Sequence, residues 1–303
     1  MADYKVKTYI TGSNATMLSS QIETTLGGRY LTQFVQPYNF RELLNSRNIM
    51  YNNPLAFTLK DKAQIIKLLD EYLHFGGFPE NKLYQNKRNY IDSVYKKILL
   101  GDIASRNKIR NVNTLRLIIG KIAESIKDEL SYAKLANNLK TIGIKIDRTT
   151  LVDYISYAIQ SYLIFPVYTY MGKYAEREGS PKYYFGDNGL LNLHLINKDA
   201  LLLENLVATE LLRNYHDDIY FLKSKNREYD IDFYVPSMQW AIQVAYSVNE
   251  SSYYRETSNL VKLSKYNSEI KRFSIITYDE EQTLEIEGTT IDVIPVWKWM
   301  LTI

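Results

Sequence analysis

Two acidic residues in the last third of the sequence, Glu204 and Asp232, have the types and spacing of a metal-dependent nuclease site. Glu204 lies on an expected helix, Asp232 lies on an expected strand, and a second strand follows. Carboxylates in this layout hold a divalent cation, and a neighbouring lysine helps to orient or deprotonate water. On the second strand, Gln243 and Ala245 stand where the chemistry needs an acid and a lysine. Glutamine is a neutral and weaker ligand and alanine has no polar group, so we expect a degenerate site.

An active metal-dependent nuclease using Glu204 and Asp232 is the alternative interpretation of the same residues. It requires other charged side chains to replace the missing acid and lysine, with a migrated basic residue such as Lys262 beside the two carboxylates. The charged residues that the sequence offers for this purpose are Asp230, Glu228, Lys223 and Lys262.

Other site chemistries are excluded by composition or by missing motifs. Cys 0 excludes disulfides, thiol nucleophiles and cysteine zinc sites, and His 3 leaves little for a histidine metal site. Neither a G-x-x-x-x-G-K-[ST] nor a G-x-G-x-x-G sequence occurs, so the chain has no phosphate loop of its own.

A second group of polar residues begins a predicted recognition helix. Lys145, Arg148, Thr149 and Thr150 lie at the turn and first residues of the second helix in a helix–turn–helix. Two alternating stretches follow that helix, and this order is typical of a winged helix, whose second helix can enter a DNA major groove. The same residues also fit a solvated face on a packing module, and winged helices also dock proteins. The predicted winged helix consists of helices at 131–140 and 147–163 and strands at 164–171 and 182–187.

The elements around these residues predict a mixed α+β protein of the α/β class. Apolar spacing at i, i+3 and i+4 predicts helices through the middle of the chain, and a helix–strand–strand–strand–helix–strand order follows from residue 200. The helices are expected at 15–26, 41–47, 60–75, 86–99, 113–126, 201–215, 253–266 and 297–303. The remaining strands are expected at 5–14, 218–224, 229–235, 240–247, 272–279 and 290–296.

Composition fits an ordinary folded protein of about two domains. Of the 303 residues, 46% are hydrophobic and 23% are charged, and the formal net charge is +3. This charge is too small to indicate a nucleic-acid partner by itself. The 27 tyrosines are mostly expected in the core, with Tyr253 and Tyr254 beside Arg255 as candidates for a groove. Without a signal peptide or an apolar run of roughly 18 residues, we expect a cytoplasmic protein that does not enter a membrane.

Several motifs, in order along nearly the whole chain, resemble a prokaryotic AAA-type (P-loop) ATPase family. Its members join a P-loop domain to a winged helix and a restriction-endonuclease-like C-terminal domain, known as domain of unknown function 4143. The matching segments are ITGSNATMLSS at 10–20, GGRYLTQFVQPYNFRELL at 27–44, GGFPE at 76–80, DIASRNKI at 102–109, KYYFGDNGLLN at 182–192, ENLVATELLR at 204–213, EYDIDFYV at 228–235 and IQVAYS at 242–247.

The resemblance implies that this chain is the part after the Walker motifs. It implies a remnant of the AAA domain at 1–57, a helical and winged-helix domain at 58–190, and a nuclease-like domain at 191–303. Ser13 and Asn14 match the nucleotide sensor of the ATPase, and Arg29 matches an arginine that acts on phosphate charge, although it also fits a structural loop residue. ATP and Mg²⁺ would serve intact relatives, and we expect no cofactor or metal for this chain alone.

The sequence therefore predicts a binding module that is not an active enzyme by itself. It would be the C-terminal portion of a AAA-family ATP-binding protein, acting on DNA or on a partner protein, with a degenerate nuclease-like domain. The alternatives are the active nuclease and a protein-interaction subunit that binds no nucleic acid. The candidate partners are DNA, a partner protein or a second copy of the chain.

Overall fold

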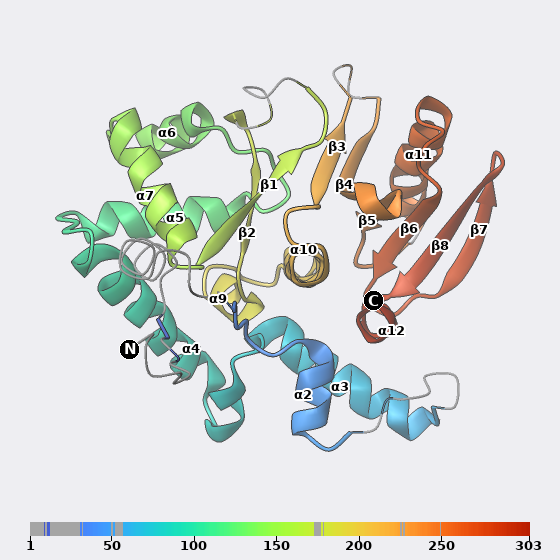
Figure 1. The fold of residues 1–303 in the computed structure, drawn as a ribbon, viewed down its shortest axis with the longest axis horizontal. Helices are drawn as coiled ribbons and strands as arrows, with labels where there is room; N and C mark the ends of the chain where they lie inside the picture. Colours follow the sequence, from blue (N-terminus) through green and yellow to red (C-terminus); the bar gives the residue numbers. More distant parts are fainter. Residues whose placement is uncertain are drawn as a thin grey trace, which may run out of the picture.

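The protein is described by a computed structural model over residues 9, 11–12, 31, 33–49, 51, 57–172, 177, 179–224, 226, 228–248 and 250–303. In these parts of the chain, helices surround one eight-stranded mixed sheet, which confirms the predicted α/β class (Figure 1). The strand expected at 5–14 and the helix expected at 15–26 fall almost entirely outside the described residues.

The chain from residue 40 to residue 160 is mostly helical, and polar side chains fix where its helices begin. Asp147 accepts the Thr150 backbone N–H at 2.9 Å and Ser131 accepts that of Lys134 at 3.2 Å, so both residues are N-caps. In order, the elements are α2 (Phe40–Ser46), α3 (Leu59–Phe75), the 3₁₀ helix η3 (Pro79–Leu83), α4 (Lys87–Lys96), the π-helix η4 (Lys97–Ser105), α5 (Val112–Glu124), α6 (Tyr132–Thr141) and α7 (Arg148–Gln160).

The three helices α5, α6 and α7 are followed by an antiparallel pair of strands. Strand β1 (Ile164–Thr169) pairs with β2 (Lys182–Phe185), and a short helix α9 (Asn188–Asn192) and the long helix α10 (Asp199–Tyr215) follow. The register places Ile164 opposite Phe185 and Val167 opposite Lys182. The assignment as a winged helix stays a prediction.

The remaining strands extend the same sheet. They are β3 (Tyr220–Lys223), β4 (Asp230–Val235), β5 (Trp240–Val244), β6 (Arg272–Thr277), β7 (Gln282–Ile286) and β8 (Thr289–Pro295); η5 (Pro236–Met238) follows β4, α11 (Glu250–Tyr266) joins β5 to β6, and α12 (Val296–Thr302) follows β8. The order across the sheet is β2-β1-β3-β4-β5-β6-β8-β7. Strands β3, β4 and β5 pair antiparallel, whereas β1 with β3, β5 with β6, and β6 with β8 pair parallel.

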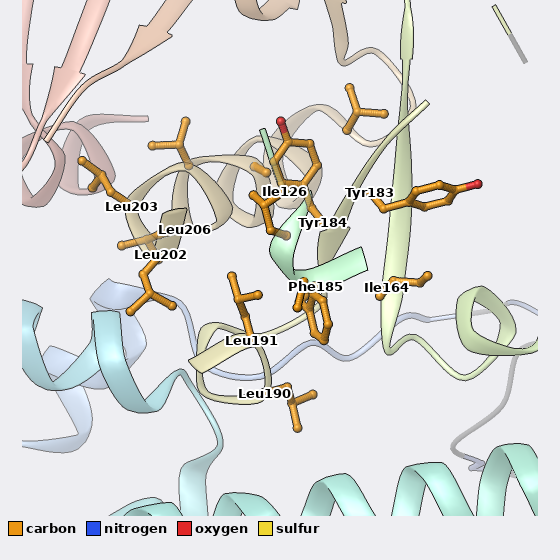
Figure 2. Packing of buried hydrophobic residues seen from close by; sticks show 14 of the residues in the cluster. Ile126, Ile164, Tyr183, Tyr184, Phe185, Leu190, Leu191, Leu202, Leu203 and Leu206 are labelled. Atoms are coloured by element: carbon orange, nitrogen blue, oxygen red, sulfur yellow. The ribbon is translucent and has the colours of Figure 1, made fainter. Parts of the chain in front are cut away.

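Two hydrophobic clusters hold these layers together. The larger cluster joins α10 to β2, α9 and the helical half of the chain, as Leu202, Leu206 and Phe185 show in Figure 2. In the smaller cluster, Leu260 and Leu263 of α11 pack against β-strand residues of the C-terminal part of the sheet. The sheet therefore separates α10 from α11.

Packing continues across residue 190, where the sequence predicts a domain boundary. Tyr184 on β2 and Phe233 on β4 lie 5.4 Å apart between ring centroids, and both belong to the larger cluster. Strand β1 also pairs with β3 through Tyr168 and Tyr220. The boundaries at 57 and 190 stay predictions. No helix in the described parts of the chain combines the length and apolar character needed to cross a membrane.

Candidate functional site

The structure brings Glu204 and Asp232 into one buried cluster of charged side chains. Glu204 lies on α10 and has no exposed surface, while Asp232 on β4 keeps 19% of its side chain exposed. Lys182, on β2, places its Nζ 3.6 Å from Asp232 Oδ1. Lys127, just after α5, places its Nζ 3.2 Å from Glu204 Oε2. The two predicted acids thus each have a lysine from a segment that precedes α10 in the chain.

Gln243 has a structural place in this cluster, between β4 and β5. Its Oε1 accepts the Asp232 backbone N–H at 2.8 Å, and its Nε2 donates to the Asp230 carbonyl at 3.1 Å. The Val244 backbone N–H in turn donates to Asp232 Oδ2 at 2.9 Å. These bonds fix the position of the Asp232 carboxylate and occupy both ends of the glutamine amide.

Two further residues, Tyr184 and Glu256, belong to this cluster. The Tyr184 hydroxyl donates to Glu204 Oε1 at 3.0 Å, from a ring that is fully buried (Figure 2). Glu256, buried on α11, accepts from Gln243 Nε2 at 3.5 Å and pairs with the exposed Arg255. The cluster therefore contains the three carboxylates Glu204, Asp232 and Glu256 and the three cations Lys127, Lys182 and Arg255.

Burial and charge act in opposite directions on these groups. Burial raises the pKa of Glu204, as does the neighbouring Asp232, while Lys182 and Lys127 lower it. Burial by itself would lower the pKa of Lys182, but Asp232 and Glu204 outweigh burial and raise it, so Lys182 keeps its proton. Burial also raises the pKa of Glu256. The ammonium groups thus supply the positive charge that a divalent cation supplies in a nuclease site.

Access to this charge cluster is restricted. Lys182, Gln243 and Glu256 each expose 3% or less of their surface. A phosphodiester substrate would have to reach the carboxylates through Asp232 alone. Within the described residues, no group of three or more His, Cys, Asp or Glu side chains is arranged to hold a metal ion.

The other charged residues considered from the sequence lie outside this cluster. Lys223 pairs with Glu129 at 2.6 Å and with Asp230 at 3.5 Å. Lys262 is exposed on α11, and among the described residues the ion-pair partners of Glu204 and Asp232 are Lys127 and Lys182. The lysine beside Asp232 is Lys182, on a strand of the predicted winged helix.

At the predicted recognition helix, Lys145, Arg148 and Thr149 are exposed, whereas Thr150 is half-buried. The Thr150 hydroxyl donates its hydrogen to Oδ2 of the N-cap residue Asp147 at 2.6 Å, so this donor is already used within the helix. The Asp147 carboxylate also places negative charge at the end of the helix where a phosphate would bind.

The three residues predicted to sense nucleotide, Ser13, Asn14 and Arg29, lie outside the described residues.

Two of the motifs that carry the family resemblance meet at a buried junction. Gly76 ends α3 with φ of +69°, and a Cβ built there would lie 1.9 Å from Asp187 Oδ1. The Gly77 backbone N–H donates to Asp187 Oδ2 at 2.7 Å, and that of Gly189 donates to Oδ1 at 2.8 Å. Burial raises the pKa of Asp187 to about 6, although these backbone donors lower it. The GGFPE segment therefore has a structural role, and its first glycine is the C-cap of α3.

A third motif joins this junction through two asparagines. Asn188 Nδ2 donates to the Leu73 and Leu202 carbonyls, each at 2.9 Å. Asn205 accepts the Phe185 backbone N–H at 2.7 Å and donates to Asn188 Oδ1 at 2.9 Å. Since α3, β2, α9 and α10 meet here, these motif residues fix the position of α10, and with it that of Glu204.

Lys182, Lys127, Tyr184 and Glu256 are cluster residues that the sequence reasoning missed. A lysine in a strand with aromatic neighbours, as in 182–185, is the one local signal that could have identified Lys182. Its partner could not be identified this way, because β2 reaches β4 only through the pairing of β1 with β3.

Comparison with known proteins gives a family without an assigned function. Residues 66–219 match the model of a domain of unknown function, DUF8612. An uncharacterized protein of Methanocaldococcus jannaschii is 31% identical, over 97% of this chain and 68% of its own length. An uncharacterized protein of Haemophilus influenzae is 30% identical, over 96% of this chain and 70% of its own length. No solved structure gives a significant match.

Proposed function

Because this chain belongs to the family of the domain of unknown function DUF8612, which assigns no activity, we propose its function from its own geometry. It is a binding module of a AAA-type ATP-binding protein, and its nuclease-like part does not cleave nucleic acid. The module binds DNA or a partner protein in the cytoplasm. The observation that carries this proposal is the pairing of Glu204 and Asp232 with Lys127 and Lys182.

The element order supports a nuclease-like origin for the C-terminal part. Helix α10, the antiparallel strands β3, β4 and β5, helix α11 and the parallel strand β6 follow the layout expected for such a site. Asp232 and Gln243 face each other on β4 and β5, and the Asp232 N–H donates to the glutamine. A glutamine and a buried alanine at 245 replace the expected acid and lysine.

Charge and burial support the loss of cleavage. Metal-assisted hydrolysis needs carboxylates free to hold the cation and a path for the phosphodiester. Here two lysines already pair with the acids, and the Tyr184 hydroxyl binds Glu204 Oε1. These contacts give the cluster a structural role, because they hold α10, β2 and β4 together. We therefore propose that the chain acts by binding and does not cleave.

A cleavage assay tests this proposal. Supercoiled plasmid incubated with the purified protein and Mg²⁺ or Mn²⁺ should remain supercoiled. Nicking that the wild type shows and Asp232→Ala abolishes would overturn the proposal. Asp230→Ala is the matched control, because it removes an exposed acid of the same strand.

An active nuclease is the second candidate, and Lys182 is the observation in its favour. Its Nζ lies 3.6 Å from Asp232 Oδ1, so β2 supplies the lysine that β5 lacks. In that case Lys182→Met, as well as Asp232→Ala, would abolish nicking, and Lys262→Met would leave it unchanged.

Nucleotide binding is part of the proposal only for intact relatives. The sequence lacks a phosphate loop, and we expect the chain by itself to bind no ATP with useful affinity. Titration calorimetry with Mg-ATP should show no binding in the micromolar range, and micromolar binding would contradict this part.

A further inference from the structure

Positive charge is concentrated in one segment of this nearly neutral chain. Residues 82–121 contain ten Lys and Arg and two acids, which gives 10 − 2 = +8. The whole chain carries +3, so the other residues together carry 3 − 8 = −5. The segment runs from η3 through α4, η4 and α5, on the side of the molecule away from β7 (Figure 1).

Several of these ten cations are already bound within the chain. Arg88 donates to the Asn192 and Leu193 carbonyls. Four others pair with acids at 2.6–3.3 Å: Lys87 with Glu71, Lys96 with Asp92, Lys121 with Glu124 and Arg106 with Asp102.

Five more cations remain without an acidic partner among the residues that the structure describes: Lys82 in η3, and four residues from the start of η4 to α5. Lys97 begins η4, Lys108 and Arg110 lie in the turn between η4 and α5, and Arg116 lies on α5. All four side chains are exposed. We call these four residues the basic elbow.

The turn in the basic elbow is held by the backbone and by one apolar side chain. The Ile109 N–H donates to the Ala104 carbonyl at 2.9 Å, and Ile109 packs against the larger hydrophobic cluster. Lys108, with φ of +53°, and Arg110 flank this anchored residue and are exposed. A turn whose backbone is held in place loses less conformational freedom on binding than a mobile loop does.

We propose that the basic elbow binds the phosphate backbone of duplex nucleic acid. Exposed hydrogen-bonding groups, Ser105 and Asn113, accompany the cations, and side chains of these types contact phosphates in protein–DNA complexes. This inference rests on the proposed function, in the form in which the module binds DNA. It places the DNA contact at the basic elbow and not at the predicted recognition helix. There, the acids Asp147 and Asp153 are exposed beside Lys145 and Arg148.

A fluorescence anisotropy titration with a labelled duplex of mixed sequence tests the inference. The elbow variant carries Lys97→Gln, Lys108→Asn and Arg110→Gln; asparagine is chosen at 108 because it tolerates positive φ. The matched control carries Lys145→Gln and Arg148→Gln. We expect wild type to bind with a salt slope of about −3.6, from four phosphate contacts at about 0.9 each. The elbow variant should bind more than tenfold more weakly, and the control within about twofold of wild type.

The outcomes separate failure of this inference from failure of the proposed function. If wild type binds duplex and the elbow variant binds equally well, the inference about the basic elbow is wrong, while the proposed DNA-binding function is still supported. If wild type binds no duplex at low or moderate salt, both the inference and the proposed binding of DNA are wrong. Binding of a partner protein is then the remaining proposal. Elbow-dependent binding to anionic lipid vesicles, without duplex binding, would also overturn the inference. Unchanged circular dichroism and urea midpoints confirm that the variants are folded.

Discussion

Replacing Lys182 with methionine should destabilise the protein far more than removal of an ordinary surface lysine. Methionine is similar in length and apolar, so it fills the space of the lysine side chain, which is only 4% exposed. The substitution removes the ammonium group that compensates Asp232 and Glu204. Both carboxylates would then be buried with less positive charge beside them.

The size of the effect follows from the distance and the burial. At an effective dielectric constant of about 20, two unit charges 3.6 Å apart attract by about 5 kcal/mol. The cost of removing one partner from a buried pair is about 3–5 kcal/mol, because the other charge is left uncompensated. The 19% exposure of Asp232 allows water to reach one side, so we expect the lower part of that range.

A double-mutant cycle in urea measures this effect. Lys182→Met should lower the free energy of unfolding by about 3 kcal/mol. Lys182→Met with Asp232→Asn should recover most of the loss, because the Asp232 charge is then absent and Glu204 keeps its pair with Lys127. Lys223→Met is the matched control: Lys223 is 33% exposed in its pair with Glu129, so the loss should stay below about 1 kcal/mol. A loss below about 1 kcal/mol for Lys182→Met, or no recovery in the double variant, would refute the reasoning.

Three further predictions concern the junction and the buried polar groups. Gly76→Ala should cost more than about 3 kcal/mol, because φ is +69° and the added Cβ meets Asp187, whereas Gly120→Ala, in open space on α5, should stabilise by about 0.5–1 kcal/mol in urea unfolding. Tyr184→Phe should cost about 1–3 kcal/mol in the same assay, because Glu204 Oε1 loses its buried donor; an unchanged midpoint would contradict this. Burial lowers the pKa of His194 to about 4 from 6.5, so the unfolded chain binds this proton more tightly and stability is lost as pH falls from 6.5 to 4. His194→Leu should therefore gain on the order of 3 kcal/mol relative to wild type between pH 6.5 and 4, and a pH-independent difference would contradict the assignment.

The sequence predicts most helices because their apolar spacing is local. The helix expected at 60–75 is α3, Leu59–Phe75, and Gly76 is its C-cap. Strand β7 was missed, because it is an edge strand with little burial. Glu287 and Gly288 both have positive φ and form the tight turn to β8, and the glycine is the part of this turn that the sequence shows.

Only part of the candidate site can be predicted from the sequence, because local patterns do not show which distant elements pack together. Glu204 and Asp232 were identified because helix and strand positions follow from local patterns. Lys182 and Lys127 come from elements whose relation to α10 and β4 depends on long-range packing. No local pattern says that β1 adds to β3 in parallel, with Tyr168 opposite Tyr220.

The contact between α2 and α12 has a consequence for the order in which the chain becomes structured during synthesis. Arg41 on α2 donates to the Met300 carbonyl, 259 residues later, at 3.1 Å, and also to the Ile303 carbonyl. At roughly 5–20 residues per second, a ribosome needs roughly 13–50 s to make the intervening chain. During that time α2 cannot bind α12, although it is made first. The earliest described helix is therefore among the last to reach its final set of contacts.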